Sequence, residues 1–414
     1  DTRSRSRPQR LRPGPLAERD ADRRADQVHT ARQRDLHGAE PAARQPRGDL
    51  DDGRPVGRPH HVALDHAGPD AERPPGEGEV GLRYSHYQEF QPGAERIEVV
   101  LPALFVLVPV AEDWTIQGQL ALDSVSGASP LYHDTLSGAS GIGVDDVRRS
   151  LDVDATRYFD RASLAFGASV SREDDYDSDA VRAVATFDSA DRNRTITVGV
   201  GYSDDTIDSV NGVAEHEARN TTDAQVGVAR VLTSRDVAQA SVTFAHGSGY
   251  YDDPYKVLDR RPGSRDERAL SLRWNHAYDT PGEVLRVAYR LFDDSWGITA
   301  HSVDLAWRHP FANDFAVEPS LRYHSQSAAD FYFDPPVGTG FVPGEPYSAD
   351  ARLSAFGAVT AAIKLEVPFG SRWRSDFKLS FYRQKSAWRA FGDGSPDLLP
   401  VSARTFEIGL TYEY

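Results

Sequence analysis

Two sets of charged residues are the strongest candidates for chemistry in this sequence. The acidic set is Glu98, Asp123, Asp152 and Asp154. The basic set is Arg273, Arg286, Arg290, Arg308, Arg322 and Arg352. If the two sets line one cavity from opposite sides, they place a transverse electric field across it, and such a field favours small polar or zwitterionic solutes. The chain must then contain elements that bring both sets to that cavity.

Other reactive groupings have weaker support. Carboxylates cluster at 173–179, 204–208 and 252–253, but none has the spacing of a calcium loop, so solvated loops without metal are expected. His301 with Ser302 and His324 with Ser325 are loose candidates for a lipid hydrolase, although no nucleophile-elbow motif accompanies them. Phosphate-loop, HExxH and CxxC motifs are also missing. We therefore expect no cofactor, no metal, no catalytic residue and no enzyme activity.

Composition excludes several classes of protein. The 414 residues are 39% hydrophobic, with a mean hydropathy of -0.54. No run of about 18 apolar residues is present, so a bundle of membrane-spanning helices is excluded. The most apolar stretch, 99–111, contains Pro102 and Pro109, which disfavour a helix there. The net charge of -16 argues against nucleic acid as a partner, because phosphate binding needs basic clusters.

Residues 1–78 differ in composition from the rest of the chain. They contain no Phe, Trp, Tyr or Ile and are rich in Arg, Pro, Ala, Asp and Gly. Such a segment cannot bury enough apolar surface to offset its ordering entropy, so disorder is expected. Two interpretations of this segment remain open. It is a flexible periplasmic extension, or it is translated from an out-of-frame or misassigned start and does not belong to the protein. The folded unit is predicted to span 79–414.

From residue 79 onward the hydrophobic pattern has a period of two. Ile196, Val198, Val200 and Tyr202 alternate with small or polar residues, as expected for a strand with one apolar face. About sixteen such segments are predicted, most of them about 10 to 14 residues long, a length suited to tilted strands that span a membrane. They begin near residues 79, 96, 113, 147, 161, 177, 193, 219, 236, 266, 283, 297, 314, 350, 372 and 401.

The connections between these segments alternate in length. Every even-numbered segment is followed by a short turn, and several odd-numbered segments are followed by long loops. The long loops cover 124–146, 204–218, 247–265, 327–349 and 385–400. Short turns on one side and long loops on the other, with an even number of strands, are typical of outer-membrane barrels. The predicted fold is therefore an all-β, transmembrane antiparallel barrel with periplasmic turns, extracellular loops and both ends of the sheet in the periplasm.

The last segment favours the same interpretation. Phe406, Ile408, Leu410, Tyr412 and Tyr414 alternate up to an aromatic final residue. Barrels inserted by the outer-membrane assembly machinery end in this way, so that machinery is an expected partner of the C-terminal strand, together with outer-membrane lipid.

The sequence from Arg96 to Tyr414 resembles the family catalogued as domain of unknown function 3570, predicted barrels of the bacterial outer membrane. The matching phrases are LDSVSGAS from Leu122, DDPYKVLD from Asp252, RPGSRDERALSLRW from Arg261, DDSWGITAHSVDL from Asp293 and LRYHSQSAADFY from Leu321. The resemblance implies location and fold, and the family has no activity to carry over. Members of that family are often encoded near small lipoproteins and flavin-transfer enzymes, so the resemblance implies a redox-related envelope system, although nothing else in this sequence points to one.

Alternation of side chains predicts that the acidic set points into the barrel from strands two to four and the basic set from strands ten to fourteen. These strands lie on opposite sides of a ring of sixteen, so the sequence predicts a porin-like channel or structural barrel with a charged lumen. In the competing interpretation, the arginines pair with Asp304, Glu318, Glu366 and Asp376 and merely fill a polar interior.

Strand two carries an unusual pattern. Val100, Leu104, Val106 and Val108 are predicted to point inward, where water is expected. An apolar patch on a lumen wall suggests that an inserted loop or another protein packs there. A scaffold for an envelope partner is therefore the alternative function.

Overall fold

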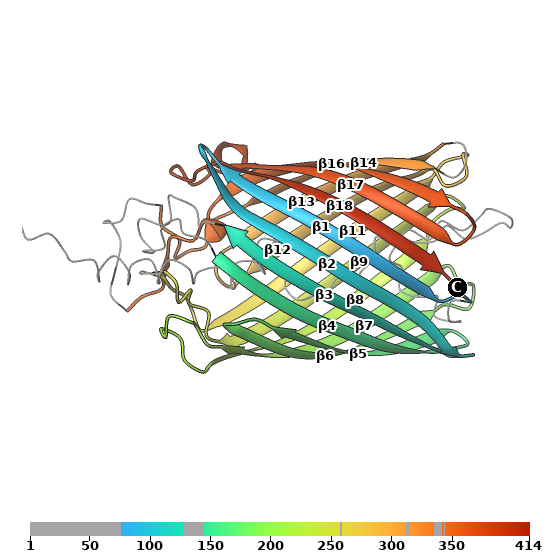
Figure 1. The fold of residues 1–414 in the computed structure, drawn as a ribbon, viewed down its shortest axis with the longest axis horizontal. Helices are drawn as coiled ribbons and strands as arrows, with labels where there is room; N and C mark the ends of the chain where they lie inside the picture. Colours follow the sequence, from blue (N-terminus) through green and yellow to red (C-terminus); the bar gives the residue numbers. More distant parts are fainter. Residues whose placement is uncertain (1–75, 128–143, 257–258, 312–314, 335–341, 343) are drawn as a thin grey trace, which may run out of the picture.

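The chain forms a closed antiparallel barrel. The computed structural model describes residues 76–414 except 128–143, 257–258, 312–314, 335–341 and 343. Sixteen strands of the described chain pair in a ring, and the last strand, β18, pairs with the first, β1 (Figure 1). The predicted fold class and strand number are confirmed. The predicted N-terminal segment 1–78 lies outside the described residues apart from 76–78.

The strands follow the chain in simple up-and-down order, interrupted by two short strands outside the ring. The elements are β1 (Glu79–Gln91), β2 (Ala94–Ala111), β3 (Trp114–Gly127), β4 (Val144–Phe159), β5 (Ala162–Arg172), β6 (Tyr176–Asp188), β7 (Arg194–Ile207), β8 (Glu217–Val231), β9 (Asp236–Gly249), β10 (Asp259–Arg260), β11 (Ser264–Ala277), β12 (Val284–Asp294), β13 (Thr299–Pro310), β14 (Ala316–Gln326), β15 (Tyr347–Ser348), the 3-10 helix η2 (Ala351–Leu353), β16 (Phe356–Phe369), β17 (Trp373–Lys385), the 3-10 helix η3 (Ser386–Trp388) and β18 (Val401–Glu413). No helix among the described residues is long and apolar enough to cross a membrane.

The outer face of the barrel is apolar at mid-height. On β7, Ile196, Val198, Val200 and Tyr202 are exposed on the outside, whereas Gly199 is buried on the opposite face. The same alternation recurs around the ring, as at Phe166 and Val170 of β5. Every backbone N–H and C=O of a spanning segment needs a partner in hydrocarbon, and closure of the ring provides one along both edges of each strand. The apolar exterior and the closed ladder together fit a lipid environment.

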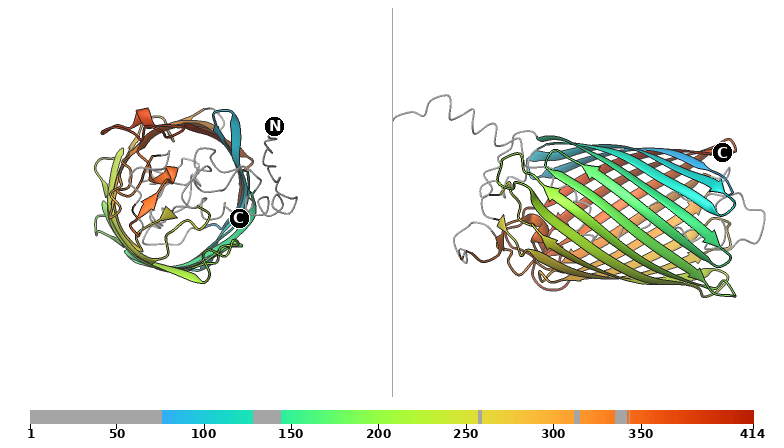
Figure 2. Two further views of the ribbon diagram at one scale, coloured as in Figure 1. Left: turned by 90° about the vertical axis from the view of Figure 1, so that its left-hand side faces the viewer. Right: turned by 90° about the horizontal axis from the view of Figure 1, so that it is seen from below.

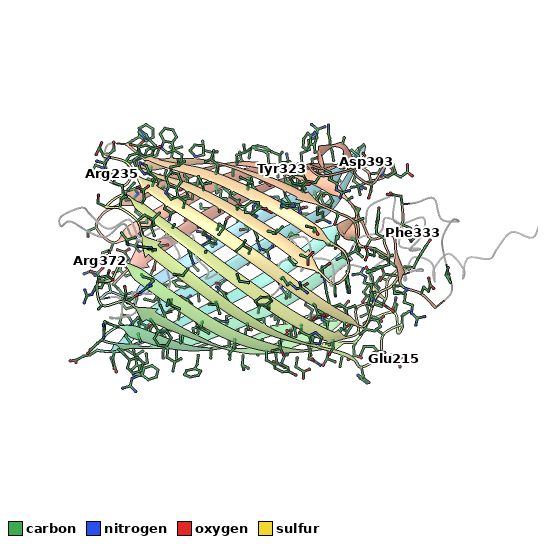
Figure 3. The ribbon with its side chains drawn as sticks, turned by 180° about the vertical axis from the view of Figure 1, so that it is seen from behind. Glu215, Arg235, Tyr323, Phe333, Arg372 and Asp393 are labelled. Carbon is green, nitrogen blue, oxygen red and sulfur yellow. The ribbon has the colours of Figure 1, made fainter. Side chains whose placement is uncertain are left out.

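The two ends of the barrel differ in their connections. At one end, which we call the short-turn end, the links include Glu112–Asp113, Asp160–Arg161 and Gly370–Arg372. Gly78 and Tyr414 also meet there, because the Gly78 N–H donates to the Tyr414 carbonyl at 2.9 Å. Figure 3 shows Arg235 and Arg372 at the short-turn end and Glu215, Phe333 and Asp393 at the opposite, long-loop end.

Residues of two long-loop connections form a small sheet at the mouth of the barrel. β10, from the loop between β9 and β11, pairs with β15, from the loop between β14 and β16. Viewed along the barrel axis, both strands lie within the outline of the ring (Figure 2). The fourteenth strand of the ring starts at Phe356 and not near residue 350 as predicted, because 350–355 belongs to this loop structure.

The prediction for β2 was wrong about which face of the strand points into the lumen. Leu82 of β1 is on the outside, and it pairs with Leu104. Val100, Leu104, Val106 and Val108 therefore point outward, and so does Glu98, whose carboxylate contacts His86 at 2.6 Å. Both faces of this strand are apolar, so alternation alone gave no basis for choosing between them.

Candidate solute pathway through the lumen

Most of the predicted charged residues occupy lumen-facing strand positions. On the acidic side, Asp152 and Asp154 of β4 alternate with the outward-facing Leu151 and Val153. The Asp123 position on β3 pairs with Arg148 of β4, and its side chain lies outside the described residues. On the basic side the lumen-facing residues are Arg273 of β11, Arg286 and Arg290 of β12, Arg308 of β13 and Arg322 of β14.

The basic wall, formed by the lumen-facing side chains of β11 to β16, contains shared ion pairs. Arg322 contacts Asp304 at 2.6 Å, and Arg286 contacts Glu318. Glu366 is shared by Arg308 at 2.8 Å and by Lys364 at 2.9 Å. Three carboxylates thus serve four cations, and Arg273 and Arg290 add two further positive charges. The wall therefore contains many of the pairings that the competing interpretation predicted and still keeps an excess of positive charge.

That excess does not extend to the long-loop end. There, Arg265 of β11 lies between Glu267 at 3.1 Å and Asp294 at 2.5 Å. The positive field is therefore centred in the middle of the barrel and in its short-turn half.

The acidic wall, formed by lumen-facing residues of β4 to β8, depends on two glycines. Asp154, Gly167, Arg182, Gly201 and Asp223 occupy one register row across five successive strands. Arg182 contacts Asp154 directly across Gly167, where a Cβ atom would lie 2.2 Å from the Asp154 carboxylate. A Cβ on Gly201 would lie 2.4 Å from the Asp223 carboxylate. The glycines allow these charged side chains to lie flat along the wall.

The seam where the barrel closes uses the same arrangement. Arg83 of β1 contacts Asp376 of β17 at 3.2 Å across Gly409 of β18, and it contacts Glu407 of β18 at the same distance. Nearer the short-turn end, Arg374 contacts Glu79 at 3.3 Å and Glu413 at 2.9 Å. The seam is thus joined by ion pairs between residues about three hundred positions apart in sequence. Asp376 was proposed from the sequence as a partner for lumen arginines, but its link to β1 was not foreseen.

Apolar side chains line part of the lumen on β2. The positions that alternate with the outward-facing Leu104 are Val99, Leu101, Ala103, Phe105 and Leu107. Val99 is buried and packs against Tyr87 of β1. The apolar lumen patch predicted for this strand is therefore present, but it is formed by the other set of residues.

Arg352 is not a strand residue of the lumen wall, which corrects the prediction. It lies in η2, where it contacts Asp350. Arg352 belongs to a group of six charged residues from two connections, which we call the loop cluster. Four come from the connection between β9 and β11 and two from the connection between β14 and β16: Asp253, Lys256, Asp259, Arg261, Asp350 and Arg352. Alternation could not place Arg352, because a long irregular loop has no periodic pattern.

Asp350 is the centre of the loop cluster. Its carboxylate accepts from Lys256 Nζ at 2.7 Å and from Arg261 Nη2 at 2.9 Å, and it caps η2 through the Arg352 backbone N–H. Burial disfavours the charged form, but attraction to Arg352, Lys256 and Arg261, with hydrogen bonds from Arg352, holds the pKa of Asp350 well below its usual range. The side chains of Lys256, Arg261 and Asp350 are each at most 8% exposed, so the cluster is a buried ionic centre.

The loops also pack against the inner wall of the barrel. Phe292 of β12 and Ala300 of β13 point inward and form a buried cluster with Trp296, Ile298 and Leu353. Another loop contact joins the Tyr255 hydroxyl to the Asp175 carboxylate at 2.5 Å. The described loops therefore form an ordered cover over part of the mouth.

The side chains of the serine and histidine of each pair considered from the sequence, His301 with Ser302 and His324 with Ser325, do not contact each other. Consecutive residues on a strand point to opposite faces. Ser302 points inward and its hydroxyl lies 2.9 Å from Nδ1 of His324 on the adjacent strand. Ser325 accepts a hydrogen bond from the Ala390 N–H, and His301 contacts Tyr289. Within the described part of the chain no group of three His, Asp or Glu residues is arranged to hold a metal ion.

Four of the five residues of the C-terminal signature share one face of β18, and Tyr414 follows the end of the strand. Phe406, Ile408, Leu410 and Tyr412 pair with His86, Tyr84, Leu82 and Val80, on the outside of the barrel. Their recognition by the assembly machinery stays a prediction.

Comparisons with known proteins identify a family and several similar solved structures. The model of the family "Protein of unknown function (DUF3570)" matches residues 135–217 and 212–406. No curated protein matches the sequence. Among solved structures, a bacterial polysaccharide outer membrane secretin is 10% identical, with 81% of this chain and 98% of that chain covered and a TM-score of 0.46. A FadL homologue of Pseudomonas aeruginosa is 11% identical, with 82% and 90% covered and a TM-score of 0.41. Likenesses at this level support no statement about function.

Proposed function

Because the chain belongs to the DUF3570 family of proteins of unknown function, from which no activity can be transferred, we propose its function from the lumen: a channel for small polar or zwitterionic solutes. The supporting observation is that excess charges of opposite sign occupy opposite walls. β4, which carries Asp152 and Asp154, is eight strands away from β13 in the ring of sixteen. Opposed walls of this kind orient a dipolar solute as it passes and disfavour apolar ones.

The same proposal places the barrel in the outer membrane of a Gram-negative bacterium. The apolar exterior contacts lipid, the short-turn end faces the periplasm and the loop cluster faces the outside. The assembly machinery engages β18 during insertion. The ordered loops around β10 and β15 then cover part of the outer entrance and restrict the size of the solutes that enter.

Planar-bilayer recording on the refolded barrel tests the proposal. We expect stepwise single-channel conductance, and reversal potentials in a salt gradient that depend on the lumen charges. A folded barrel that inserts and gives no conductance would remove the channel function.

Replacing Arg273 by glutamate should shift the ion selectivity toward cations. The basic wall has an excess of positive charge, and a change of two charge units there alters the field where the lumen is confined. The reversal potential in a salt gradient measures the effect. Arg230→Glu is the matched control, because Arg230 points outward on β8 and the same change there should leave the selectivity nearly unaltered. Equal shifts for both variants would contradict a lumen field.

A second candidate function, the scaffold for an envelope protein, is favoured by the apolar lumen residues of β2. Val99, Leu101, Phe105 and Leu107 offer a surface for another chain inside the barrel. A photoreactive amino acid at position 105, introduced in cells, tests this function. A specific adduct with one envelope protein, together with absence of conductance, would favour the scaffold over the channel.

A further inference from the structure

Three lumen residues lie in one register row across β12, β13 and β14. Arg290 pairs with Ser302, and Ser302 pairs with His324. Directly opposed residues on one face have Cβ atoms about 5 Å apart, so the three side chains are neighbours. Ser302 therefore lies between Arg290 and His324 in this row.

The hydrogen bonds around His324 determine which ring nitrogen carries the proton. Gln326 Nε2 lies 2.9 Å from the Arg352 carbonyl and 2.8 Å from the Ser354 carbonyl, so it must be the amide nitrogen that donates. The Gln326 Oε1 atom is then the acceptor that lies 3.2 Å from His324 Nε2. A neutral His324 consequently carries its proton on Nε2, and its Nδ1 lone pair accepts from the Ser302 hydroxyl at 2.9 Å.

We propose that Ser302 is an activated nucleophile with His324 as its general base, and that it accepts acyl groups from small carboxylic esters that enter the lumen. In the Ser-His-Asp triad Nε2 is the base and Nδ1 donates to the orienting group, whereas here Nδ1 is the base and Nε2 donates to Gln326. The roles of nucleophile, base and orienting group are otherwise the same. Gln326 is the positioning residue, because it fixes the tautomer of His324. This function goes beyond solute passage.

The reaction balances with water as the second substrate. The Ser302 Oγ atom bonds to the carbonyl carbon of the ester while its proton moves to Nδ1 of His324. The ester C–O bond then breaks, and the same proton passes to the departing alkoxide, which leaves as an alcohol. Water, deprotonated by Nδ1, attacks the acyl carbon, and the carboxylic acid leaves as Ser302 regains its proton.

Arg290 is the group placed to stabilise the negative charge of the tetrahedral intermediate. Backbone N–H groups on these strands are used in the hydrogen-bonded ladder, so an oxyanion in the lumen depends on side chains. Arg290 lies beside Ser302 in register, and it also pairs with Ser271 of β11 on its other side. Ser271 is therefore a matched control, because it is paired with the same arginine on one side but with Ser241, and not with a histidine, on the other.

Labelling of the refolded full chain with a fluorophosphonate probe tests the proposal. We expect peptide mass spectrometry to locate the label at Ser302, with Ser302→Ala unlabelled and Ser271→Ala labelled at the rate of the unmodified protein. Removing a general base costs about 100-fold or more, so His324→Gln should slow labelling by that factor. Hydrolysis of p-nitrophenyl acetate should follow the same order.

Folding of each variant is checked by the heat-dependent shift of the barrel on a denaturing gel. If His324→Gln fails to fold, the pH dependence of labelling in the unmodified protein tests the role of His324 instead. Labelling must slow at acidic pH, once the imidazole is protonated. Gln326→Leu should slow labelling and change this pH profile.

An unlabelled Ser302 in the folded barrel, or a labelling rate independent of His324 and of pH, would overturn the proposal. Ser302→Ala should conduct like the unmodified barrel, so failure here is distinguishable from failure of the channel function.

Discussion

Replacing Asp350 by asparagine should destabilise the packing of the loops at the mouth by about 3–5 kcal/mol, the range for removing one partner of a buried ionic group. Lys256, Arg261 and Arg352 all contact this carboxylate, so the neutral amide would leave an excess of buried positive charge. The sixteen-strand ring does not depend on the cluster and should stay folded. Limited proteolysis of the refolded protein measures the effect, with cleavage within 250–256, 259–263 or 344–355 at least tenfold faster.

Asp393→Asn provides the control for this variant. Asp393 is an exposed carboxylate on a neighbouring loop at the same end of the barrel (Figure 3). A neutral substitution at such a site changes stability by no more than about 0.5 kcal/mol. Cleavage of Asp350→Asn at the rate of the unmodified protein would show that the loops are held mainly by the apolar cluster around Phe292 and Trp296.

The loop packing should also resist mild acid. The pKa of Asp350 is lowered in the folded protein, so its stabilisation is fully present above the ordinary carboxyl pKa of 3.8 and is lost only as the pH falls through the lowered value. Proteolysis with an acid-active protease should therefore find the loops of the unmodified protein closed at pH 4 and 5. Opening between pH 5 and 4 would contradict a charged, well-paired Asp350.

Period-two patterning was sufficient to predict the ring because each strand must present apolar side chains to lipid. On β7 and β5 the two faces differ along the middle of each strand, so the inward and outward positions there follow directly. β2 is the exception, since Val99, Leu101 and Phe105 are as apolar as Val100 and Leu104, and a shift of one residue inverts every position. Glu98 was placed on the wrong face for that reason.

The loop cluster could not be predicted from the sequence. Asp253 and Asp350 lie about a hundred positions apart, and the charges of loops are ordinarily solvated. Their burial follows from the packing of Trp296 and Leu353 against the inner wall, which is a property of the folded mouth. The hydrogen bond between Ser302 and His324 was not predicted either, because the candidate residues were paired with their neighbours in sequence and not with residues on the adjacent strand.

Adding a single methyl group at Gly409 should weaken the closure of the barrel. The Cβ atom of Gly409→Ala would lie 2.2 Å from the Asp376 carboxylate, so Asp376 must move away from Arg83. Overpacking of this kind costs about 1–3 kcal/mol, and here it acts between β17 and β1, on either side of the closing strand. We expect a lower urea concentration at the midpoint of unfolding, measured by tryptophan fluorescence in detergent micelles.

Gly199→Ala separates this effect from the general cost of altering a strand glycine. Gly199 also faces the lumen, on β7, but a Cβ atom there would have only ordinary contacts, the nearest being Val184 at 3.5 Å. Alanine at this position should leave the midpoint unchanged or raise it slightly, because alanine loses less backbone entropy on folding than glycine. If both variants lowered the midpoint equally, the ion pair across Gly409 would not be the cause. A loss confined to Gly409→Ala, and abolished when Asp376 is already replaced by alanine, would assign the closure of the ring to this contact.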